Sequence, residues 1–192
     1  MGKNRLEAFS DGVLAIIITI MVLELKVPHG EHLDALAKLL PVFLSYVLSF
    51  IYIAIYWNNH HHMLHAVTHV SARILWANMN LLFWLSLVPF VTGWMGENHF
   101  AATPCALYGV VLLMSGFAYW LLQHAIIAAQ GESSILKKAI GSDIKGNLSL
   151  ALYVVGIALA FLWNWVSLGV YVFVALMWLV PDKRVERALS EK

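Results

Sequence analysis

Residues 5–27 read RLEAFSDGVLAIIITIMVLELKV, and this stretch decides the class of protein. From Gly12 to Leu23 it is an unbroken run of apolar and small residues whose one hydroxyl belongs to Thr19. A membrane-spanning helix needs roughly 20 mostly apolar residues, because each adds about 1.5 Å against a hydrocarbon core of about 30 Å. We therefore expect this stretch to form a spanning helix.

Five further apolar segments follow it along the chain. The 192 residues are 61% hydrophobic and 12% charged, whereas soluble domains carry about 25% charged residues. We expect an all-α polytopic membrane protein, one domain over residues 1–192, with six transmembrane helices per subunit. The predicted helices cover approximately residues 6–27, 39–62, 74–95, 104–129, 147–163 and 166–180.

The distribution of basic residues predicts the orientation of these helices. With the N-terminus inside, ten of the twelve Lys and Arg residues fall on the cytoplasmic side, and only Lys26 and Lys38 fall outside. The positive-inside rule favours this arrangement. We expect a multi-pass protein of the cell (plasma) membrane with N- and C-termini cytoplasmic. Because topology accounts for the basic residues, nothing indicates a nucleic-acid partner.

Asp11 lies inside the first apolar segment. An ionisable residue in a spanning helix is costly unless it is paired or hydrated, so it indicates a functional site by default. The alternative interpretation places Asp11 at the cytoplasmic interface, where it caps or solvates the start of the helix. Its position alone leaves both interpretations open.

One face of the first helix carries a stripe of apolar residues with a single hydroxyl. At about 100° per residue, the stripe contains Gly12, Ile16, Thr19, Ile20 and Leu23. Asp11 lies about 140° from Ile16 on the same count, and is therefore directed toward other helices of its own subunit. Ile17, about 100° away, is expected to face lipid. Such a stripe by itself more often faces lipid or packed core than a pore.

A sequence motif precedes this stripe. The spacing Arg-x-x-x-Phe-Ser-Asp at residues 5–11 resembles the signature of the transmembrane protein 175 family, the endolysosomal potassium channels and their prokaryotic relatives. The resemblance extends to WNNHH at residues 57–61, and to Asn80 with LVPF at residues 87–90. With the six-helix layout, it covers essentially the whole chain.

The resemblance implies a potassium-permeable cation channel with a pore lined by the first helix of each subunit. A carbonyl filter would need a Thr-Val-Gly-Tyr-Gly type of loop, which this chain lacks. Family members with a single repeat resemble tetramers, so we expect a homotetramer around a central pore in the lipid bilayer. It would conduct potassium ions and need no cofactor.

Carried over by position, the resemblance also assigns roles to single residues. Ile16 would form the narrow hydrophobic ring, with Ile20 and Leu23 as further apolar layers and Thr19 as a hydroxyl layer near the constriction. A narrow apolar neck gates by dewetting. The other motif residues would form a polar network that fixes the first helix against the second and third, with His60 or His61 as its histidine. These residues are Arg5, Phe9, Ser10, Asp11, Trp57, His60, His61 and Asn80.

Nine histidines suggest two other functions. His62, His65 and His69 have helical spacings that a zinc or di-iron site could use. A membrane desaturase or hydroxylase would need further histidine clusters, so we expect neither an enzyme nor a metal site. The stronger alternative is a proton-coupled or ion-coupled secondary transporter, in which Asp11, Glu24 and histidines relay protons. Transporters usually show internal symmetry and interrupted helices, and the sequence indicates neither.

Overall fold

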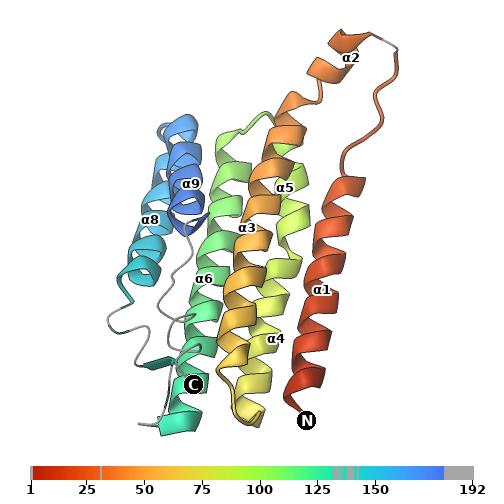
Figure 1. Cartoon of the computed structure of the whole chain (residues 1–192). Coiled ribbons are helices and arrows are strands. Elements are labelled where there is room, and N and C mark those ends of the chain that lie inside the picture. Colours follow the sequence, from red (N-terminus) through yellow and green to blue (C-terminus); the bar gives the residue numbers. More distant parts are fainter. Residues whose placement is uncertain are drawn as a thin grey trace.

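The computed structural model describes residues 2–30, 32–131, 134, 136–137, 141 and 143–179, which form a bundle of helices (Figure 1). The first half contains α1 (Lys3–Leu23), the short α2 (Leu33–Ala37), α3 (Leu40–His65), α4 (Ala72–Ser86) and α5 (Val88–Glu97). The second half contains α6 (Ala102–Gln130) and a hairpin of α8 (Ile144–Ala160) and α9 (Asn164–Leu179). The predicted end of the last helix and the charged C-terminal tail lie outside the described residues.

Among the described residues, four helical segments are long and apolar enough to cross a membrane: Lys3–Leu23, Leu40–His65, Ala72–Glu97 and Ala102–Gln130. Helices α8 and α9 are apolar but have only 17 and 16 residues. At about 1.5 Å per residue, each is about 25 Å long, less than a hydrocarbon core of about 30 Å. That all six helices span the bilayer therefore stays a prediction.

The third spanning segment is not the continuous helix predicted for residues 74–95. Helix α4 ends at Ser86 and α5 begins at Val88, with Leu87 as the cap residue between them. Pro89 explains the break, because proline has no N–H to donate and its ring clashes with the carbonyl four residues earlier. The N–H of Leu87 instead donates to the carbonyl of Trp84, at 3.2 Å. The span is two helices in line.

The helices pack in an order that leaves α1 at one edge of the subunit. Helix α1 contacts α3, α4 and α5, whereas α6 contacts α4, α5, α8 and α9. Figure 1 shows α1 at one side of the bundle and the α8–α9 hairpin at the other. The buried side of α1 carries Leu6, Ser10, Leu14, Ile17 and Met21. These residues recur every three or four positions, so a single face of α1 holds it to its own subunit.

Glycines allow Tyr171 to lie between α6 and α8. A Cβ atom at Gly109 would lie 2.0 Å from the Tyr171 hydroxyl oxygen, and one at Gly156 would lie 2.5 Å from its ring. The Tyr171 side chain is fully buried and donates to the carbonyl of Cys105, at 3.3 Å. Small residues at helix contacts are how membrane helices approach closely. These glycines fix α9 against its neighbours.

The turn between α5 and α6 joins the tip of the α8–α9 hairpin. His99 and Phe100 adopt φ angles of 52° and 59°, and the amide of Asn164 donates to the Phe100 carbonyl at 2.6 Å. Trp163 and Trp165 at the tip are 65% and 64% exposed. Tryptophans are enriched at the membrane–water interface. We therefore expect this tip to lie near the headgroups.

Candidate pore face and its supporting network

Helix α1 has one buried face and one exposed face. The four residues predicted to line a pore lie on the exposed face, with Ile16 58%, Ile20 43% and Leu23 77% exposed. Thr19 is exposed as well. Ile17, which we expected to face lipid, is instead 3% exposed and belongs to the core, because it lies on the same side of α1 as Leu14 and Met21.

The hydroxyl of Thr19 is bonded within its own helix. Its Oγ1 donates to the backbone carbonyls of Ile16 and Ala15, at 2.9 Å and 3.1 Å. Back-bonding of this kind is typical of threonine in helices. Because the hydrogen is directed toward the backbone, the lone pairs of Oγ1 stay available on the exposed face. The side chain can therefore offer an oxygen to a cation.

A buried chain of hydrogen bonds joins α1, α3 and α4. His60 Nε2 lies 2.7 Å from Asn78 Oδ1, Asn78 Nδ2 donates to Ser10 Oγ at 2.9 Å, and Ser10 Oγ donates to the Leu6 carbonyl at 2.9 Å. An amide oxygen can only accept, so Nε2 of His60 carries the hydrogen. All three side chains are 2% exposed or less. Each buried side chain thus donates a hydrogen bond to the next, from His60 on α3 through Asn78 on α4 to Ser10 on α1.

Asp11 makes a second contact between α1 and α3. The indole Nε1 of Trp57 donates to Asp11 Oδ1 at 3.0 Å, and the Trp57 ring stacks against the His61 ring with centroids 6.1 Å apart. His61 is exposed, so of the two histidines predicted as alternatives His60 makes the buried hydrogen bond and His61 supports Trp57. The partner of Asp11 is a neutral donor.

Three predicted network residues lie outside these hydrogen bonds. Asn80 is partly exposed, Arg5 is exposed and Phe9 is 46% exposed. Neither the Arg5 nor the Asn80 side chain forms a hydrogen bond or ion pair with the residues that the structure describes. The structure assigns the amide of the network to Asn78, which the sequence prediction missed. Helical spacing could have found it, because Asn78 recurs with Ile74, Leu81 and Leu85 on the buried face of α4.

A hollow lined by two carboxylates lies at the C-terminal end of α1, beyond the apolar stripe. A space of about 300 Å³ is lined by Glu24, Phe90, Gly93, Trp94 and Glu97. The Glu24 carboxylate packs on Gly93, where a Cβ atom would lie 3.1 Å from Oε2. Lys26 Nζ lies 2.5 Å from Glu97 Oε1. This hydrogen bond and the charge of Glu97 raise the pKa of Lys26 above its usual value. One lysine thus accompanies two carboxylates at this end.

The histidines after α3 contact one another through their rings. The His61 ring lies 4.7 Å from that of His65 and 5.6 Å from that of His62, each edge-on. Within the described part of the chain, no three His, Cys, Asp or Glu side chains are grouped so that they could hold a metal ion.

Comparison with known proteins identifies the family. Residues 5–89 match the family described as the endosomal/lysosomal potassium channel TMEM175. A protein of Chryseobacterium sp. (strain P1-3), named a potassium channel, is 56% identical over 191 residues, which covers all of both chains. A protein of Chamaesiphon minutus with the same kind of name is 31% identical over 188 residues, 90% of this chain and 91% of that one.

A solved structure agrees with these matches. It is the crystal structure of a TMEM175 homologue from Chamaesiphon minutus, described as a lysosomal potassium-selective channel. The TM-score is 0.78 at 30% identity, over 94% of this chain and 97% of that chain. The resemblance drawn from residues 5–11 is thus confirmed over nearly the whole length. The chain belongs to the TMEM175 family.

Proposed function

We propose that this protein is a potassium-permeable channel of the cell membrane, formed by four copies of the chain around a central pore. The observation that carries the proposal is the division of α1 into a buried face and an exposed face that holds Ile16, Ile20 and Leu23. Relatives named potassium channels support potassium as the permeant ion. The single copy of the motif at residues 5–11 supports four subunits, each contributing one α1.

The exposed face of α1 suits a pore better than a lipid contact. It combines Ile16 and Ile20 with a hydroxyl at Thr19 and with Gly12, where a Cβ atom would meet nothing within 4 Å. The opposite face is held by the bonds of Ser10 and Asp11 to α4 and α3. A helix anchored on one side and open on the other can be packed around an axis by symmetry, as closed oligomers require.

The constriction we propose is an apolar ring of four Ile16 side chains. A cation that enters such a neck must shed water without gaining a full set of ligands, which is unfavourable until the neck widens. Four Thr19 hydroxyls one turn away would supply some of the missing oxygens. Selectivity would thus come from partial replacement of the hydration shell and would be weaker than in a carbonyl filter.

The acidic hollow at the end of α1 would form part of the outer mouth. Glu24 and Glu97 carry two negative charges against the one positive charge of Lys26. Repeated in four subunits, this excess would raise the local cation concentration, an effect that salt screens within about 10 Å at an ionic strength of 0.1 M. With N- and C-termini cytoplasmic, this mouth faces outward.

Reconstitution into liposomes tests the proposal. Vesicles loaded with potassium and held against a potassium-free solution should lose potassium through the protein until the membrane reaches the potassium equilibrium potential. The flux should continue when proton and sodium gradients are both abolished. Flux that stops without a second gradient would indicate the coupled-transporter alternative, which no relative reported above supports. A large impermeant cation in place of potassium serves as the control.

Native mass measurement tests the assembly. The protein in detergent should have the mass of four subunits, and cross-links between residues near Ile16 should join neighbouring copies. A stable monomer that conducts would contradict a pore made from four α1 helices.

A further inference from the structure

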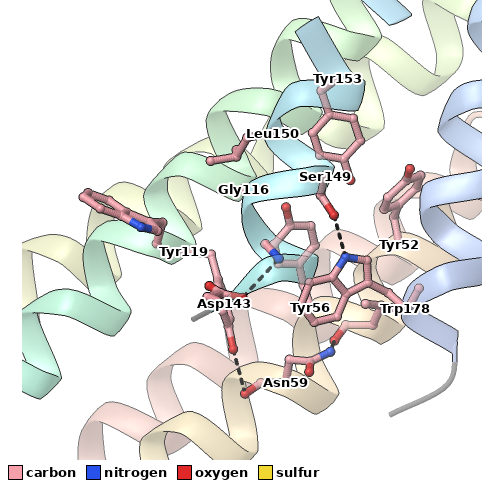
Figure 2. A pocket seen from close by; sticks show the side chains of 13 residues that line it. Tyr52, Tyr56, Asn59, Gly116, Tyr119, Asp143, Ser149, Leu150, Tyr153 and Trp178 are labelled. Atoms are coloured by element: carbon pink, nitrogen blue, oxygen red, sulfur yellow. Dashed lines mark hydrogen bonds between the residues drawn. The ribbon is translucent and has the colours of Figure 1, made fainter. Parts of the chain in front are cut away.

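A small cavity lies inside the subunit between α3, α6, α8 and α9, with no residue of α1 in its lining (Figure 2). Its volume is about 60 Å³, and a water molecule needs about 10–15 Å³ on this measure. The cavity can therefore hold a small organic group. Six of its thirteen lining residues are aromatic: Tyr52, Tyr56, Tyr119, Trp120, Tyr153 and Trp178.

Gly116 provides part of this space. A Cβ atom at Gly116 would lie 3.1 Å from Leu150 Cδ2 and 3.7 Å from the Tyr56 hydroxyl oxygen. Tyr56 and Tyr119 meet edge to face beside it, with centroids 6.2 Å apart. Glycine at this position keeps α6 from filling the cavity.

Three of the aromatic side chains that line the cavity donate their polar hydrogens to protein acceptors. Tyr52 donates to the Tyr171 carbonyl at 2.6 Å, Tyr119 to the Asn59 carbonyl at 3.3 Å, and Trp178 to Ser149 Oγ at 2.8 Å. These hydrogen bonds hold the rings in place, and the face of an aromatic ring carries a negative electrostatic potential. The Tyr56 hydroxyl differs, because it forms no hydrogen bond to any described residue although Tyr56 is 9% exposed.

A carboxylate lies at one end of the cavity. Asp143 lines it just before α8, and Tyr153 lines it about 15 Å further along the helix axis (Figure 2). Asp143 accepts hydrogen bonds from the Gly146 N–H at 3.0 Å and from Gln123 Nε2 at 3.2 Å. Both donors are neutral, and no Lys or Arg of the described ranges forms a salt bridge with Asp143. Asp143 thus places a carboxylate at this end of the cavity.

One ring of the cavity already contacts a cation. Lys145 Nζ lies 5.6 Å from the centroid of Trp178, within the range of cation–π attraction. A metal ion would favour several carboxylate ligands, and Asp143 is the one carboxylate among the residues that line the cavity. Organic ammonium groups are the cations that aromatic cages recognise.

We propose that this cavity binds a small organic ammonium group of the choline or ethanolamine class, with the rings around its substituents and Asp143 as counter-ion. Gln123, the partner of Asp143, lies seven residues before the end of α6 at Gln130, about 10 Å along the helix. At that depth the group could come from a lipid headgroup or from a free amine. The inference is independent of the proposed pore, because the site lies within one subunit.

Thermal unfolding of the purified protein in detergent tests the binding. Choline should raise the midpoint in a concentration-dependent way, because a ligand that binds only the folded state stabilises it. The matched control is the neutral dimethylbutanol isostere, in which carbon replaces the nitrogen, and it should leave the midpoint unchanged. Equal responses to both compounds, or no response to choline, would overturn the proposal.

Two substitutions locate the site. Asp143→Asn keeps an acceptor for Gly146 but removes the charge, and should weaken choline binding by about tenfold or more. Asp34→Asn, which removes an exposed carboxylate of α2 outside the cavity, should bind as the unaltered protein does. If Asp143→Asn unfolds, Tyr56→Phe gives the second measurement and should also weaken binding. Unchanged binding in both cavity variants would refute the assignment.

Varying the lipid composition distinguishes the two sources of the ammonium group, a lipid headgroup and a free amine. In nanodiscs, phosphatidylethanolamine in place of phosphatidylglycerol should reduce the effect of choline if the natural occupant is a headgroup. An equal effect in both lipids would assign the site to a free amine from solution.

Discussion

The imidazole Nε2 of His60 lies 2.7 Å from the amide oxygen of Asn78, and the same amide donates to Ser10. One side chain of α4 thus joins α3 to α1. This amide therefore helps to hold the buried face of α1 against α3 and α4.

Asn78→Leu should therefore destabilise the subunit. It leaves the buried Nε2–H of His60 without its acceptor and removes the donor to Ser10 Oγ, which keeps its own bond to the Leu6 carbonyl, at a cost of about 1–3 kcal/mol. We expect a lower unfolding midpoint and a lower yield of tetramer. Asn80→Leu is the matched control and should unfold like the unaltered protein. Equal losses for the two variants would show that the hydrogen bonds of Asn78 contribute nothing specific.

Asp11→Asn should have a small effect. Its partner in the described structure is the neutral indole of Trp57, so the change costs about 1 kcal/mol, less than breaking a buried ion pair at about 3–5 kcal/mol. The tetramer should stay abundant with unaltered potassium preference in bilayer recordings. A well-folded variant with changed selectivity would move Asp11 from the scaffold into the pore.

Gly109→Ala should disturb the packing of α9 on α6. The new Cβ would lie 2.0 Å from the Tyr171 oxygen, so the buried ring must move, and overpacking costs about 1–3 kcal/mol. Gly169→Ala is the control on α9, because its Cβ would meet nothing within 4 Å. The first variant should unfold at a lower temperature, and the second at an unchanged or higher one.

The amphipathic pattern of α1 was predictable because exposure follows helical periodicity. The same rule, applied to α4, would have favoured Asn78 over Asn80, since the two lie about 160° apart on a helix. The prediction of Asn80 came from its place near a family motif and not from its face. Periodicity is thus the better guide to which amide is buried.

Other features depend on tertiary contacts that periodicity does not contain. The break at Leu87 follows from Pro89, yet a proline can also kink a helix without ending it. The cavity needs Tyr56, Tyr119 and Tyr153 to meet from three helices, and each tyrosine alone is compatible with ordinary core. Which faces meet is decided by the packing of α6 against α8.

Thr19→Ala should reduce the preference for potassium over sodium and leave total conductance nearly unchanged. It removes four oxygens from the proposed pore without altering its bore much, and its hydrogen bonds are all within α1. Reversal potentials under mixed potassium and sodium gradients measure the preference. Thr19→Ser keeps the hydroxyl and should retain the selectivity of the unaltered protein. Identical reversal potentials for the Ala and Ser variants would exclude Thr19 from ion coordination.

Ile16→Asn should raise the basal conductance and weaken discrimination among cations, because four amides make an apolar neck wettable. The control must be equally exposed but on another face of α1. Ile17 cannot serve, since it is 3% exposed and any polar substitution there disturbs the core. Val22 is 46% exposed and lies about 120° from Ile16, so Val22→Asn tests the same chemistry off the stripe. Single-channel recordings decide: if the two variants conduct alike, ions do not pass along the Ile16 face.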